Sequence, residues 1–262
     1  GSVKSNKIVF IFNFKHVINS HIGLPDIYNA FFVLLALITA LDVWKNSSLK
    51  NYLIAGIAVG LSLSVKYQIF AIFPLALVHF YLSFEKGGFN PRLLFNKMII
   101  IAGVCIPLVF VLINPYHLVF MDRTVQIVKD VSQKYGMGTK QVNFYPFSYF
   151  FHIDYGAIES ALIFLGIAIA FRKFVKQTLF LWTFLIPFMF VMVYYSRGGF
   201  YVRNFITTTP IFLIFAAIFF KWLYIVLKKV SPAWMAVFVS VILFVATVFV
   251  PGRNALINSY YY

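Results

Sequence analysis

The feature that most constrains this chain is a series of long apolar runs separated by short polar breaks. One run, FFVLLALITALDVW, is followed within a few residues by another, LIAGIAVGLSLSV, and such runs recur to the end of the chain. A helix that spans a membrane needs about 20 predominantly apolar residues. Of the 262 residues, 62% are hydrophobic and 11% are charged, whereas soluble domains have about 25% charged residues. The sequence therefore predicts an all-α, polytopic membrane protein.

We predict about eight spans in one transmembrane helix bundle, with a long polar stretch between the fourth and fifth spans. This stretch, at about residues 115–150, contains MDRTVQIVKDVSQKYG. Its apolar residues recur at helical spacing, so we expect an amphipathic helix that lies on the membrane interface. The spans are expected at about residues 27–44, 52–65, 68–84, 98–113, 155–171, 178–195, 205–227 and 233–250.

Basic residues in short loops mark the cytoplasmic side of a membrane protein. The net charge of +15 is explained by such helix-flanking residues, or by sites for an anionic lipid or phosphate. Nucleic-acid binding is not favoured, because no basic cluster stands apart from the apolar runs. If the spans alternate, the cytoplasmic face carries Lys45, Lys50, Lys86, Arg92, Lys97, Arg172, Lys173, Lys176, Lys228 and Lys229.

Two charges on the opposite, extracytoplasmic face are the first site candidates. Asp26 follows Pro25 at the start of a long apolar run, and Lys66 lies in a break between two runs. A charge at the centre of a membrane helix costs roughly 2.5–3.5 kcal/mol, so both belong at helix ends or in a wet cavity. Asp26 is either a helix N-cap or a catalytic or metal-binding carboxylate. Lys66 either snorkels to lipid headgroups or binds a phosphate.

Further candidates lie on the same face. Arg197 and Arg203 flank Gly-Gly-Phe-Tyr, and arginine forks match phosphate oxygens, although an interfacial anchor explains this loop equally well. His21 lies in the loop before Asp26. A weak metal-binding pattern is formed by His152, Asp154 and Glu159, and we assign no metal site to it. Glu159, about one turn inside an apolar run, is expected to face protein or water rather than lipid.

Several segments together resemble the GT-C class of membrane glycosyltransferases, especially the protein O-mannosyltransferase-like and aminoarabinose transferase-like branch. They are PDIYNAFFVLLAL, YLIAGIAVGLSLSVKYQIFAIFPLALVHFYL, INPY and VRNFITTTPIFLIFAA, and the likeness covers about residues 21–227. The resemblance implies transfer of a sugar from a polyprenyl-phosphate carrier to a lipid, glycan or protein acceptor at the outer face of the cell membrane. Direct displacement would invert the anomeric centre.

The resemblance also implies roles for individual residues. Asp26 corresponds to the family's second acidic position and would orient or deprotonate the acceptor hydroxyl. The residues that would bind the lipid phosphate are Lys66, Tyr67, Arg197, Arg203 and His21. No cofactor is implied with certainty, and a divalent metal is left open.

The chain departs from the family pattern at its start. The family's first extracytoplasmic loop, with its leading acidic motif, is absent, so we interpret residues 1–262 as a single GT-C-like transmembrane domain that is a fragment. We expect this fragment alone to be inactive if the missing loop supplies the catalytic base. The main alternative is a transporter or flippase for a lipid-linked or anionic substrate, which would use the intramembrane Glu159. A non-catalytic assembly subunit is the third hypothesis.

Overall fold

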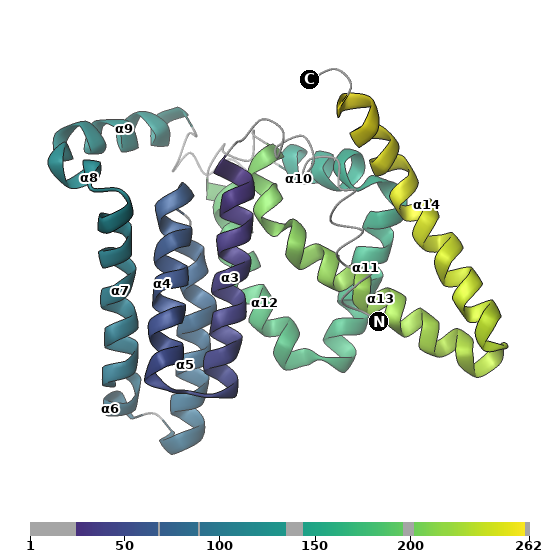
Figure 1. Cartoon of the computed structure of the whole chain (residues 1–262), viewed down its shortest axis with the longest axis horizontal. Coiled ribbons are helices and arrows are strands. Elements are labelled where there is room, and N and C mark those ends of the chain that lie inside the picture. Colours follow the sequence, from purple (N-terminus) through teal and green to yellow (C-terminus); the bar gives the residue numbers. More distant parts are fainter. Residues whose placement is uncertain (1–24, 68, 89, 135–143, 196–201, 260–262) are drawn as a thin grey trace. The chain divides into compact units, whose positions relative to one another are not determined.

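The computed structural model describes residues 25–67, 69–88, 90–134, 144–195 and 202–259, and these residues form helices joined by short turns, with no strand (Figure 1). Each of the eight predicted spans coincides with a helix, which confirms the predicted all-α, polytopic class. Within the described residues, five segments are long and apolar enough to cross a membrane: Pro25–Lys45, Ile69–Gly87, Pro91–Ile113, Val175–Tyr194 and Asn204–Val230.

The chain divides into two compact units, each described here by itself. The first, which we call the α3–α9 unit, comprises Tyr28–Asn143 and Phe180–Phe200. The second, the α11–α14 unit, comprises Gly1–Ile27, Phe144–Leu179 and Tyr201–Tyr262.

The α3–α9 unit begins with helices that alternate in direction and are joined by short connections (Figure 1). After the fourth long helix the chain makes a short helix and then the amphipathic helix that the sequence predicts, which lies across the end of α7. The helices are α3 (Pro25–Lys45), α4 (Leu49–Lys66), α5 (Ile72–Gly87), α6 (Pro91–Leu94), α7 (Lys97–Ile113), α8 (Tyr116–Val119) and α9 (Met121–Lys134).

Helices α4 and α7 pack backbone to backbone through two glycines. A Cβ atom built on Gly56 would lie 2.6 Å from the carbonyl oxygen of Ala102, and one built on Gly60 would lie 2.9 Å from that of Ile106. Small residues four apart allow this close approach between membrane helices. The contacts advance by four residues on both helices, so α4 and α7 run in the same direction. Their C-terminal ends therefore meet at one end of the unit.

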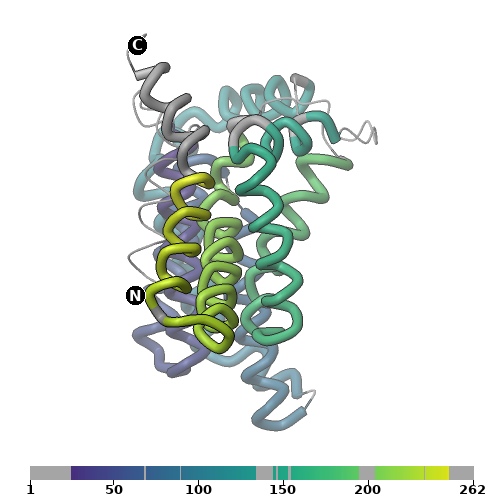
Figure 2. The backbone as a smooth tube through the Cα atoms, turned by 90° about the vertical axis from the view of Figure 1, so that its right-hand side faces the viewer, coloured from purple at the N-terminus to yellow at the C-terminus, as the bar shows by residue number. Residues whose placement is uncertain are grey.

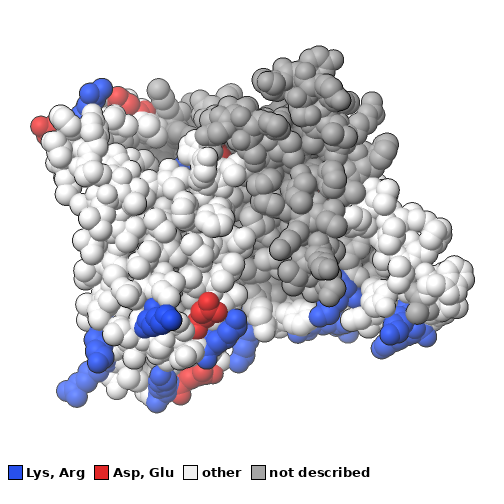
Figure 3. Space-filling view, viewed as in Figure 1, with Lys and Arg blue, Asp and Glu red and all other residues white. Residues whose placement is uncertain are grey.

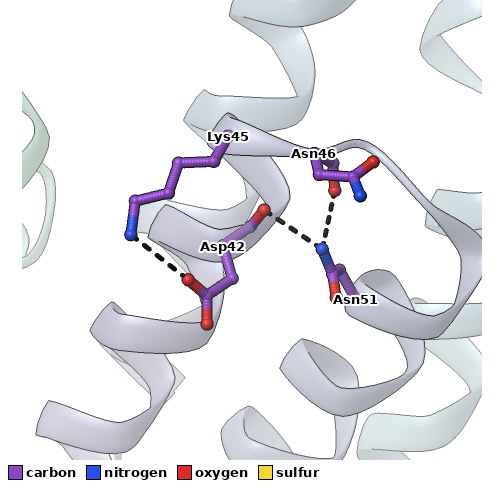
Figure 4. Close-up of polar contacts among 4 residues, drawn as sticks. All are labelled: Asp42, Lys45, Asn46 and Asn51. Atoms are coloured by element: carbon purple, nitrogen blue, oxygen red, sulfur yellow. Dashed lines mark hydrogen bonds and ion pairs between the residues drawn. The ribbon is translucent and has the colours of Figure 1, made fainter.

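The turn between α3 and α4 is held by side chains at the opposite end of the unit (Figure 4). The Asn51 amide donates hydrogen bonds to the carbonyl oxygens of Asp42, at 3.2 Å, and Asn46, at 2.8 Å. The Lys45 ammonium lies 3.4 Å from the Asp42 carboxylate. The Ser48 hydroxyl accepts from the Asn51 N–H and so caps α4. These contacts fix a tight hairpin of α3 and α4.

Basic side chains gather at this same end, as the alternation of spans predicts. The Lys86 ammonium donates to the Ser47 hydroxyl at 3.3 Å, which joins the end of α5 to the α3–α4 turn. Figure 3 shows Lys and Arg side chains concentrated there on the face in view. The exposed basic residues in and beside these turns are Lys45, Lys50, Lys86, Arg92 and Lys97.

The α11–α14 unit is built on a second close helix pair. A Cβ atom on Gly166 of α11 would lie 1.9 Å from the carbonyl oxygen of Phe215 in α13. Helices α11, α13 and α14 run side by side (Figure 2). Its elements are α10 (Tyr145–Tyr149), a π-helical turn (Phe150–Asp154), α11 (Gly156–Lys173), a 3-10 turn (Val202–Thr208), α13 (Thr209–Val230) and α14 (Ala233–Ser259).

An aromatic cluster fills the interior of this unit near the start of α11. The ring of Phe150 lies 5.6 Å from that of Phe205 and 4.9 Å from that of Tyr155, and all three are at most 1% exposed. Phe151 packs edge to face on Phe212 at 5.0 Å. These contacts tie the starts of α11 and α13 together, so the two helices run in parallel.

Helix α12 (Val175–Met189) crosses from one unit to the other along the chain and continues as a π-helical segment, Phe190–Tyr195. From Phe180 onward it packs in the α3–α9 unit, where Phe180 contacts Trp44 and Phe188 contacts Phe70 edge to face.

Replacing Gly166 by alanine should destabilise the protein, because the added Cβ would collide with the Phe215 carbonyl oxygen, 1.9 Å away. We expect a loss of about 1–3 kcal/mol, measured as a lower midpoint of thermal unfolding in detergent. Gly103→Ala in α7 is the matched control. Nothing lies within 4 Å of a Cβ atom there, and alanine is favoured over glycine within a helix by roughly 0.5–1 kcal/mol. Equal midpoints for the two variants would contradict the close packing of α11 on α13.

Candidate functional site

The end of α4 places two of the predicted site residues side by side. Lys66 is the last residue of α4, where a cation suits the negative end of the helix dipole. Tyr67 follows as the cap, and its backbone N–H donates to the carbonyl oxygen of Leu63 at 2.8 Å. Tyr67 has a φ of 52°, in the left-handed region that residues other than glycine rarely adopt. This backbone turns the chain sharply, and Tyr67 is 53% exposed.

A histidine that the sequence analysis did not single out holds the Tyr67 side chain. His117 of α8 places Nε2 2.9 Å from the Tyr67 hydroxyl and Nδ1 3.1 Å from the Thr124 hydroxyl of α9. The tautomer decides which nitrogen donates. The Phe110 ring of α7 stacks on the imidazole, with 5.5 Å between centroids and 4° between planes. We call Lys66, Tyr67, Phe110, His117 and Thr124 the Tyr67 corner.

A further contact closes the same end of the α3–α9 unit. The Asn114 side chain, directly after α7, donates to the carbonyl oxygen of Ser64 at 3.2 Å. This bond satisfies a carbonyl in the last turn of α4, where helices lack internal partners. Asn114 and His117 therefore both join the end of α7 to the end of α4.

Chemically, the Tyr67 corner offers a half-buried lysine followed directly in the chain by an exposed tyrosine, at the C-terminal end of a helix. An ammonium group is a compact cation that binds phosphate oxygens, and a phenol hydroxyl donates a hydrogen bond to them. The corner is thus suited to an anionic head group rather than to an apolar ligand.

Asp26 lies in the first turn of α3, directly after Pro25. It is 2% exposed, and Asn29, on the next turn, is 0% exposed. The positive end of the helix dipole stabilises a carboxylate at this position. Helix α3 begins, and helix α4 ends, at the same end of their hairpin (Figure 1), as the sequence predicts.

Other predicted site residues lie partly or wholly outside the described residues. His21 and Arg197 fall outside them, and Arg203 is described only by its backbone, in the 3-10 turn Val202–Thr208. That turn and the first residue of α13 carry four buried hydroxyl and amide side chains, Asn204, Thr207, Thr208 and Thr209.

Side chains are described for only part of the weak metal-binding pattern, His152, Asp154 and Glu159. Glu159 is 2% exposed in α11, which confirms that it faces protein rather than lipid, whereas His152 is exposed. The side chain of Asp154 lies outside the described residues. In the part of the chain that the structure describes, no three His, Cys, Asp or Glu side chains are grouped so as to hold a metal ion.

A second tyrosine–histidine pair lies toward the other end of the α3–α9 unit and is structural. The Tyr52 hydroxyl lies 2.6 Å from His79 Nδ1, and His79 Nε2 lies 3.0 Å from the carbonyl oxygen of Leu94. Tyr52 is 2% and His79 4% exposed. The pair therefore satisfies buried polar groups, in contrast to the exposed phenol of the Tyr67 corner.

The stretch of sequence that contains the Tyr67 corner is similar to a known protein family. Residues 6–128 match the model of the dolichyl-phosphate-mannose-protein mannosyltransferase family. No curated protein and no solved structure matches the chain. The match supports glycosyl transfer from a prenyl-phosphate-linked sugar in general, carried out by an integral membrane protein. Residues 6–128 are thus similar to this mannosyltransferase family, which confirms the resemblance to the GT-C class.

Proposed function

We propose that this protein transfers a glycosyl group from a polyprenyl-phosphate-linked sugar to a hydroxyl group of a protein, lipid or glycan. The reaction takes place at the extracytoplasmic face of the cell membrane and inverts the anomeric centre. The observation that carries this proposal is the family match at residues 6–128, because that stretch includes Asp26, Lys66, Tyr67 and His117. Mannose is the sugar that the family description favours.

In the proposed reaction, Asp26 orients the acceptor hydroxyl and accepts its proton. The acceptor oxygen bonds to the anomeric carbon as the bond from that carbon to the phosphate oxygen breaks. The electron pair leaves with the lipid phosphate, whose charge Lys66 and Tyr67 stabilise. Arg197, Arg203 and His21 are further phosphate-binding candidates.

The proposed face follows from the distribution of charge. In the α3–α9 unit, the exposed basic residues of the α3–α4 and α5–α7 turns lie at the end opposite to the Tyr67 corner. Basic residues mark the cytoplasmic side, so the corner and the start of α3 are assigned to the extracytoplasmic side.

The alternative function is a transporter or flippase for a lipid-linked or anionic substrate. The observation that favours it is the buried Glu159, since carboxyl groups within membrane spans often mark ion or substrate pathways. Movement of a labelled lipid across the bilayer without sugar transfer would support this alternative.

Asp26→Asn should lower the rate of sugar transfer by about 100-fold or more, because an amide cannot accept the acceptor's proton. The measurement is transfer of a radiolabelled sugar from polyprenyl-phosphate donors to membrane acceptors by the full-length protein in liposomes. Asp42→Asn, at the opposite end of α3 and paired with Lys45, is the matched control and should transfer at the parent rate. Undiminished transfer by Asp26→Asn would contradict the catalytic assignment.

Cysteine labelling in a Cys105→Ala background tests the proposed face. A membrane-impermeant maleimide added to intact cells should label Lys129→Cys, on the exposed polar side of α9, and leave Asn46→Cys, in the α3–α4 turn, unlabelled until the cells are opened. The reverse pattern would place the Tyr67 corner on the cytoplasmic side.

A further inference from the structure

The amphipathic helix α9 carries an apolar face that is exposed to its surroundings. Its apolar side chains lie on one side of the helix, while Asp122, Gln126 and Asp130 lie on the other. Each apolar side chain is between 42% and 52% exposed: Met121, Val125, Ile127, Val128 and Val131. A helix with one apolar and one charged side lies flat in the membrane interface.

Helix α7, which precedes this segment in the chain, has an exposed apolar surface of its own. Val104, Leu108 and Leu112 form a stripe at a spacing of four residues on α7 and are 59%, 52% and 68% exposed. The chain then turns at Asn114 and Pro115, and α9 lies across the end of α7 (Figure 1). The occupant of the apolar face of α9 is accordingly the surface of the bilayer that α7 spans.

His117 connects this interfacial helix to the Tyr67 corner. One ring nitrogen contacts the Thr124 hydroxyl, within the first turn of α9, and the other contacts the Tyr67 hydroxyl, directly after α4. The parallel stacking on Phe110 fixes the plane of the imidazole. His117 thus couples the position of α9 to that of Tyr67, the residue that follows Lys66 in the chain.

We propose that His117 is a positioning residue: it couples the membrane-seated helix α9 to Lys66 and Tyr67 and so holds them at the depth of a polyprenyl-phosphate head group. The inference rests on the proposed function of Lys66 and Tyr67. The physical reason is that the polyprenyl chain lies in the hydrocarbon layer, which confines its phosphate to the interface. A phosphate site must therefore keep a fixed depth in the membrane. Helix α9, which lies in the interface, sets that depth.

The test compares two tyrosine–histidine pairs in the full-length protein in nanodiscs. His117→Ala should raise the KM for the sugar donor and the Kd for polyprenyl phosphate by about 5–10-fold, as expected from the loss of one hydrogen bond. The kcat should change less than twofold, because His117 does not touch the reacting atoms. Tyr52→Phe, which removes one hydroxyl from the other pair, should leave both constants unchanged.

Conservative variants and a distance measurement separate positioning from a general loss of structure. His117→Gln keeps a polar group near the Nε2 position and should recover part of the affinity. Spin labels at Val128→Cys on α9 and Ile57→Cys on α4, in a Cys105→Ala background, should show a broader distance distribution in His117→Ala than in Tyr52→Phe. Weaker binding with an unchanged distance distribution would overturn the inference, because His117 would then contact the lipid directly.

The outcomes also distinguish this inference from the proposed function. If the parent protein transfers sugar and His117→Ala has the parent KM and Kd, the function stands and the inference fails. If the parent binds polyprenyl phosphate but transfers no sugar, the function fails, and the Kd of His117→Ala then decides the inference. A parent protein that binds no polyprenyl phosphate would overturn both.

Discussion

The close approach of α4 to α7 is the contact on which the arrangement of the candidate site depends. Side chains larger than hydrogen at Gly56 and Gly60 would meet the backbone or a side chain of α7 at 2.6–2.9 Å. Within a bilayer there is little hydrophobic drive between helices, so close backbone packing supplies much of their association. Because the two helices run in parallel, their ends meet. Tyr67, at the end of α4, therefore lies beside α8, where its hydroxyl contacts His117.

The two tyrosine–histidine pairs of the α3–α9 unit differ in burial. At one end of the α3–α9 unit, Tyr52 and His79 are buried and satisfy each other, which removes the cost of polar groups inside an apolar bundle. At the other end, the Tyr67 phenol remains exposed although it is hydrogen-bonded. An exposed tyrosine directly after a lysine suits an anionic ligand, which we propose to be the phosphate of a lipid-linked sugar.

Most of the fold could be predicted from the sequence, because bilayer thickness converts apolar runs directly into helices. Asp26 and Lys66 were recognisable as charges beside such runs. His117 was not, because its contact with Tyr67 joins positions 50 residues apart. The left-handed backbone of Tyr67 could not be predicted from the sequence, because glycine is the residue that usually adopts this conformation. Arg203 stays a prediction, because the structure describes only its backbone.

The central claim is that the Tyr67 corner holds the phosphate of a lipid-linked sugar. Photo-crosslinking tests it most directly, with a polyprenyl phosphate that carries a photoreactive group beside the phosphate, followed by mass spectrometry of the labelled peptides. The account predicts adducts at the end of α4 and in α8. Adducts confined to the α3–α4 and α5–α7 turns, at the basic end of the unit, would contradict it.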